Sequence, residues 1–87
     1  MLKLIISGSH KGRNYADVVT FKLIPPKGKD YAGNGHKMIV DMAGNPAAIH
    51  YVDCRYSGTT DLRKLADIWI KDYYGNTVKE VRVAWLA

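Results

Sequence analysis

Apolar and polar residues alternate along much of this chain with a period of two, which is typical of β-strands that bury one face. At the amino terminus Leu2, Leu4 and Ile6 fall on one face, and Lys3 and Ile5 fall on the other. Similar stretches recur along the chain, separated by prolines, glycines and asparagines that interrupt a strand. The pattern predicts strands at about 2–7, 17–24, 36–42, 47–56 and 78–86.

The segments between the predicted strands are polar or rich in residues that favour turns. Residues 7–16 are predicted to form a polar loop that is too long for a tight hairpin. Pro25-Pro26 ends the second strand, because proline has no N–H to donate to a β-ladder. Residues 27–35 form a second loop that contains glycines and lysines, and residues 44–46 are a predicted turn.

The period changes to that of a helix near residue 60. Apolar side chains then recur at intervals of three and four, which places them along one stripe of a helix. Thr60 suits the N-cap, Asp61 complements the positive end of the helix dipole, and Gly75 suits the carboxyl end. We expect a helix over about 60–74 that packs through this stripe, which consists of Leu62, Leu65, Ala66, Trp69, Ile70 and Tyr73.

The order of these elements is β-β-β-β-α-β, which indicates a single α+β domain over residues 1–87. We predict a five-strand, mostly antiparallel sheet with one amphipathic helix packed on one face. Residues 47–56 carry bulky side chains on both faces, which favours an interior position for that strand. In the last strand, simple alternation places Val81, Val83 and Trp85 on the same face.

Composition supports a small folded domain and narrows its function. The chain has 87 residues, of which 47% are hydrophobic and 10% aromatic, so it can form one core without being disordered. Cys54 is the only cysteine, so no intramolecular disulfide can form, and we expect it to be an unreactive packing residue. No apolar run approaches the ~20 residues of a membrane span. These features favour a cytoplasmic protein without a membrane partner.

The net charge is concentrated in one part of the chain. Residues 1–37 carry seven basic and two acidic side chains, a balance of +5, whereas residues 38–87 carry six of each. A local excess of one sign selects partners of the opposite sign. Cations near aromatic rings suit phosphates and unpaired bases. The candidate nucleic-acid-binding residues are Lys11, Arg13, Tyr15, Lys27, Lys29, Tyr31 and Lys37.

No combination of residues indicates catalysis or metal binding. His50 and Cys54 would share one face of a strand, but Asp53 would point to the other face and could not orient the histidine. His10 and His36 fall in separate loops and lack the spacing of metal ligands. We therefore predict a protein that is not an enzyme and has no metal and no cofactor.

Two classes of function remain open. The first is a non-catalytic protein that binds single-stranded DNA or RNA through its basic amino-terminal half. The alternative is a small protein-interaction module, or an inhibitor of a larger enzyme, of the kind encoded by phages and mobile elements. Its contact would be an exposed edge strand or the glycine-rich loop at residues 27–35, and an edge strand could also form a homodimer. One contiguous positive face would favour nucleic acid, and an exposed apolar patch would favour a protein partner.

Overall fold

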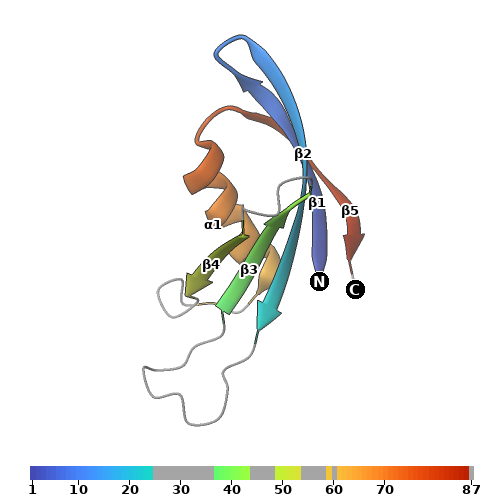
Figure 1. The fold of residues 1–87 in the computed structure, drawn as a ribbon, viewed down its shortest axis with the longest axis vertical. Helices are drawn as coiled ribbons and strands as arrows, with labels where there is room; N and C mark the ends of the chain where they lie inside the picture. The colour runs from blue at the N-terminus through green and yellow to red at the C-terminus, as the bar shows by residue number, and fades with distance from the viewer. Residues whose placement is uncertain (25–36, 44–48, 54–58, 60, 87) are drawn as a thin grey trace.

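The computed structural model describes residues 1–24, 37–43, 49–53, 59 and 61–86. Within these residues the strands hydrogen-bond in the order β4-β3-β2-β1-β5, every adjacent pair is antiparallel, and one helix lies on one side of the sheet (Figure 1). The predicted α+β class, with an antiparallel sheet and a helix, is confirmed. The elements are β1 (Leu2–His10), β2 (Arg13–Ile24), β3 (Lys37–Met42), β4 (Ile49–Asp53), α1 (Leu62–Tyr74) and β5 (Val78–Leu86).

The core lies between α1 and the sheet face that the alternation of β1 defines. Leu2, Leu4 and Ile6 are buried, whereas the residues between them are half-buried. Trp69 of α1 packs edge-on against Phe21 of β2, with ring centroids 5.6 Å apart. This geometry is favourable for aromatic pairs and fixes the helix over β2. The buried cluster consists of Leu2, Leu4, Ile6, Val19, Phe21, Met38, Val40, Leu65, Ala66, Trp69 and Ile70.

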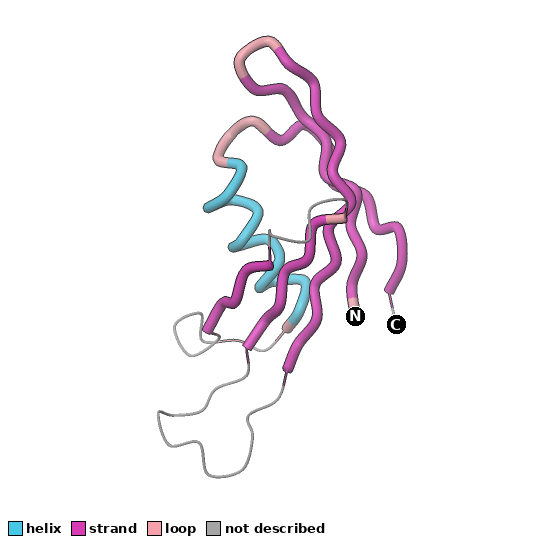
Figure 2. Tube along the Cα trace, viewed as in Figure 1, coloured by secondary structure: helices cyan, strands magenta, loops and turns pink. Residues whose placement is uncertain are grey.

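The predicted loop at residues 7–16 is wrong, because β1 and β2 continue through it as a long hairpin. His10 pairs with Arg13, so the connection is a two-residue turn. Lys11 and Gly12 both have positive φ, 51° and 78°, as in the turns whose twist matches that of a hairpin. Figure 2 shows that this end of the hairpin extends beyond the helix. Both its faces therefore carry polar residues, and no apolar alternation reveals it in the sequence.

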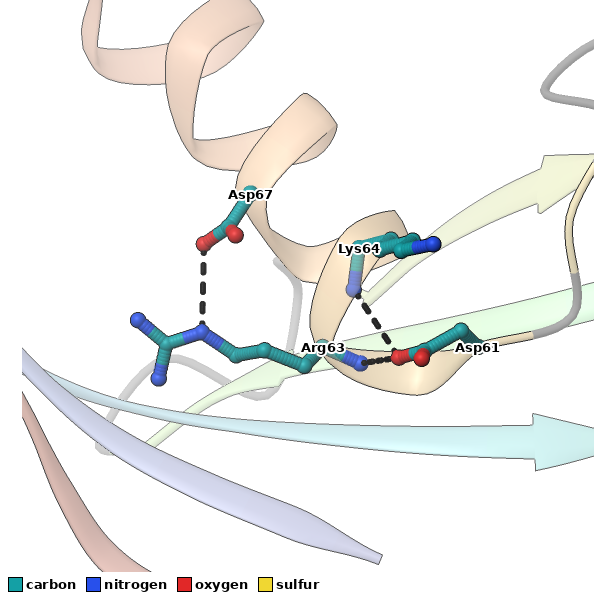
Figure 3. A network of polar contacts seen from close by, with 4 residues as sticks. All are labelled: Asp61, Arg63, Lys64 and Asp67. Atoms are coloured by element: carbon teal, nitrogen blue, oxygen red, sulfur yellow. Dashed lines mark hydrogen bonds and ion pairs between the residues drawn. The ribbon is translucent and has the colours of Figure 1, made fainter.

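The helix begins one residue later than its predicted cap implies. Asp61, not Thr60, is the N-cap, and its Oδ1 accepts hydrogen bonds from the backbone N–H groups of Arg63 and Lys64 at 3.0 and 3.2 Å (Figure 3). Arg63 also forms an ion pair with Asp67 on the solvent side, four residues further along. The carboxylate satisfies two N–H groups that the first turn leaves without helical partners.

The buried stripe of the helix is narrower than predicted at its carboxyl end. Leu65 and Trp69 are buried, but the Tyr73 side chain is 50% exposed. Tyr73 lies at the rim of the helix interface, where its ring stacks on Trp69 with centroids 4.7 Å apart. The next residue, Tyr74, is half-buried and turns toward the hairpin. Tyr74, rather than Tyr73, therefore fixes this end of the helix.

The predicted interior position of the fourth strand is also wrong. β4 lies at one edge of the described sheet, and β1 and β2 are the most central strands. Bulk on both faces of a segment does not fix its place in a sheet, because place depends on pairing between distant strands. Cys54 and its expected packing role lie outside the described residues, as does the loop at residues 27–35. Among the described residues no helix is long and apolar enough to cross a membrane.

Candidate functional site

The structure does not bring all the predicted binding residues together. Lys11 lies in the turn of the β1–β2 hairpin and Arg13 is the first residue of β2. Lys37 pairs with Ile24, at the other end of β2. Because β2 has 12 residues and a strand rises about 3.3 Å per residue, its two ends are roughly 36 Å apart. Three further predicted residues lie outside the described part of the chain: Lys27, Lys29 and Tyr31.

Tyr15, predicted to stack on a base, stacks within the protein. Its ring lies parallel to that of Tyr74, with centroids 5.3 Å apart. Its hydroxyl is 2.8 Å from Oγ1 of Thr77. The Thr77 hydroxyl donates to the Tyr74 carbonyl oxygen at 2.9 Å, so its oxygen is left to accept the proton of Tyr15. Tyr15 therefore joins the hairpin to the segment that follows α1.

The pair Tyr74–Asp17 makes a second bond across the same joint. The Tyr74 hydroxyl donates to Oδ2 of Asp17 at 2.7 Å. Burial raises the pKa of Tyr74 well above its usual range, and the hydrogen bond to Asp17 and the negative charge of Asp17 raise it further. Tyr74 consequently stays a neutral donor at any physiological pH.

A cleft of about 340 Å³ opens between the hairpin and the end of α1. Two hydrogen bonds join side chains in its lining, because Tyr74 donates to Asp17 and Tyr15 bonds to Thr77. Among the described residues that line it, Asp17 is the one carboxylate, so these residues hold no pair of carboxylates of the kind that acid–base sites use. We interpret the cleft as a structural joint between the hairpin and α1. The described residues that line it are His10, Tyr15, Asp17, Tyr73, Tyr74 and Thr77.

The sheet face opposite α1 presents a row of lysines that the sequence alone did not place. Lys3 pairs with Thr20, and Lys22 lies two residues further along β2 on the same face. Lys22 in turn pairs with Ile39, and Lys37 lies two residues before it on β3. Diagonal neighbours of this kind are about 7–8 Å apart. Lys3, Lys22 and Lys37 thus form a diagonal row across β1, β2 and β3.

Trp85 lies on this open face because of a β-bulge. Val83 pairs with Leu4 on the helix side, and the next register pair is Trp85 with Lys3. Ala84 is therefore an extra residue that reverses the alternation, so the predicted common face of Val83 and Trp85 is wrong. The Trp85 side chain is 50% exposed. Alternation cannot reveal a bulge, which is why the sequence did not place Trp85 beside a lysine.

The open face has a positive balance. Among the described residues, its basic ones are the lysine row and Arg82, which pairs with Ile5, and its acidic ones are Asp41, Glu80 and Asp53, which pairs with Lys37. Four basic and three acidic residues give a balance of +1. Glu80 is paired with Arg82, at 3.5 Å from Oε1 to Nε, so the three lysines share the rest of the face with Asp41 and Asp53 and outnumber them by one.

Comparison with protein-family models, with curated proteins and with solved structures finds no match to this chain. The function must therefore be argued from the geometry of its surfaces.

Proposed function

We propose that this protein binds single-stranded nucleic acid on the open face of its sheet. The observation that carries the proposal is the juxtaposition of the Lys3–Lys22–Lys37 row with the exposed ring of Trp85, which pairs with Lys3. Lysines at 7–8 Å steps follow an extended phosphate backbone, and an exposed indole offers a surface for stacking a base.

The bound nucleic acid must be single-stranded because of how the tryptophan would act. Bases in a duplex are already stacked and paired, so an indole on a sheet face can reach only unpaired ones. One such contact contributes about 1–3 kcal/mol and tolerates any base, because every base has a π-face. The lysines supply charge without reading sequence. The proposed activity is accordingly sequence-tolerant binding without catalysis.

The proposal is tested by fluorescence anisotropy with a labelled oligothymidylate over a series of salt concentrations. Each phosphate contact on a single strand contributes about 0.7 to the slope of log affinity against log salt, so the three lysines contribute a slope of about −2. The variant K3E/K22E/K37E should lose binding at moderate salt. The matched control is R63E/K64E/K71E, which reverses an equal number of charges on the exposed side of α1 and should leave the affinity within about twofold of the wild type.

Circular dichroism of both triple variants separates loss of binding from loss of fold. Equal weakening in the two variants would show that the open face is not the binding surface. Absence of salt-dependent binding by the wild type would overturn the proposal and favour a protein partner. In that case the exposed apolar side chains of β5 become the candidate contact, because Val83 and Leu86 are 55% and 67% exposed.

A further inference from the structure

β5 is an unusually apolar edge strand. It pairs with β1 on one side and forms an edge of the described sheet on the other (Figure 1). Val83 and Leu86 pair with the buried residues Leu4 and Leu2, on the helix side of the sheet. Both remain more than half exposed, because α1 does not extend over β5. A free edge with apolar side chains is a template for pairing with another strand.

The part of β5 that can pair regularly is short and well defined. The register with β1 shifts at Lys79 and again at Ala84. Between these two bulges, Glu80–Val83 run in regular register against β1. Bulges end regular pairing, so an added strand must centre its contacts within this run.

The charges in this run are self-complementary about Val81. We propose that two copies of the chain pair their β5 strands antiparallel about a two-fold axis at Val81. Glu80 of each copy then lies opposite Arg82 of the other, and the two Val81 side chains face each other on the helix side. Glu80 and Arg82 are both on the open face and both more than half exposed, so each is accessible to the partner copy. A two-fold axis makes the favourable pair occur twice.

Moving the two-fold axis by one residue along β5 would also keep the two open faces on the same side of the joined sheet. Charge disfavours both of these registers. An axis at Glu80 would place two glutamates directly opposite each other, and an axis at Arg82 would oppose two arginines. Like charges directly opposite destabilise a strand pair, whereas unlike charges stabilise it. Charge therefore selects both the partner, a second copy, and the register.

The dimer would join the two open faces into one continuous surface. Arg82 and Trp85 of both copies would lie near its centre, with one lysine row on either side. The inference does not require the proposed function, because it rests on the edge and charges of β5 alone. If the proposed function holds as well, the dimer binds a longer stretch of single-stranded nucleic acid than one copy does.

Sedimentation velocity of the full chain without nucleic acid tests the dimer. We expect the wild type to approach twice its chain mass of 9.7 kDa as its concentration rises to millimolar. The single variants E80R and R82E should weaken the dimer by roughly tenfold or more, because each puts like charges opposite each other twice. The double variant E80R/R82E should restore it. The variant D67R, which reverses a charge on α1, is the matched control and should dimerise as the wild type does.

Restoration in the double variant distinguishes a specific register from a general effect of charge. A wild type that stays monomeric at millimolar concentration would overturn the inference, even if it binds nucleic acid. A dimer whose double variant is as weak as the single variants would overturn the register. Loss of nucleic-acid binding with an intact dimer would instead count against the proposed function alone.

Discussion

Gly8 lies where the hairpin, the end of α1 and the start of β5 meet. It pairs with Tyr15 on one side and with Val78 on the other. A Cβ at this position would clash with the backbone oxygen of Thr77 and with the hydroxyl of Tyr15. The backbone N–H of the next residue, Ser9, bonds to the same Thr77 oxygen at 3.1 Å. Glycine is required here for close approach rather than for an unusual φ.

We predict that Gly8→Ala destabilises the protein by about 3 kcal/mol, because the clash with Thr77 involves a backbone atom that cannot rotate away. Urea unfolding followed by circular dichroism measures the change. Ser9→Ala, at the neighbouring half-buried position, is the control and should cost less than about 1 kcal/mol. An unchanged midpoint for Gly8→Ala would show that the hairpin does not pack against Thr77 as described.

Tyr74 gives the protein a specific sensitivity to alkaline pH. Its pKa in the folded state is raised, by burial first and by Asp17 second. A group with a raised folded pKa contributes stability that is complete below the unfolded pKa, about 10 for tyrosine, and declines as pH rises above it. Stability should therefore fall between about pH 9.5 and pH 11.5 as the unfolded tyrosine ionises.

The variant Tyr74→Phe should lose this part of the pH dependence, so its unfolding free energy should fall less steeply over the same interval. Urea midpoints measured by circular dichroism across the interval provide the test. Tyr73→Phe, at the half-exposed neighbouring ring, is the control. Identical slopes for Tyr74→Phe and the wild type would mean that Tyr74 is not a buried donor.

At the scale of elements, the spacing of apolar residues predicts the buried face of a strand or helix, because that face depends on residues close together in the sequence. The alternation of Leu2, Leu4 and Ile6 correctly identified the buried face of β1, and the helical spacing of Leu65 and Trp69 identified the inner side of α1. The sequence does not reveal the distal part of the hairpin, residues 7–16, because most of it extends past the helix and its residues on the helix side are Gly8, Tyr15 and polar side chains rather than a series of aliphatic ones. The cap was misplaced by one residue, since Thr60 and Asp61 are both good capping residues and sequence does not choose between them.

The cap at Asp61 can be tested separately from its charge. Asp61→Ala should destabilise the protein by about 1 kcal/mol, because the N–H groups of Arg63 and Lys64 lose their acceptor. Asp61→Asn keeps an acceptor oxygen and should cost only a few tenths of that. Thermal unfolding of the two variants compares them directly. Equal losses would show that the negative charge matters and the cap does not.

The candidate site depends on pairings that the sequence does not contain. Lys37 was among the predicted binding residues, but the diagonal that links it to Lys3 and Lys22 requires the register of three strands. Trp85 reaches the same face only through the bulge at Ala84. Conversely, the ring of Tyr15 is of a type that stacks on bases, yet in the structure it is stacked on Tyr74. Charge and composition indicated a class of ligand, and long-range pairing determined where it could bind.

At the scale of the whole molecule, the two faces of the sheet differ in what they contact and in the side chains that they carry. One face packs against α1 and holds the core, and the other presents lysines and an exposed tryptophan. The edge at β5 is where a second copy would extend both faces. We propose that the open face, rather than the hairpin turn or the helix, receives the nucleic acid.

The most direct measurement is a nuclear magnetic resonance titration of ¹⁵N-labelled protein with unlabelled oligothymidylate at low salt. The two tryptophans report from opposite sides of the sheet: Trp69 lies on α1 and is 7% exposed, whereas Trp85 pairs with Lys3 on the open face and is 50% exposed. We predict that the indole N–H signal of Trp85 and the amide signals of Lys3 and Lys22 shift, while the indole signal of Trp69 does not. Shifts confined to α1 or to the turn at Lys11, or no shifts at all, would contradict the account.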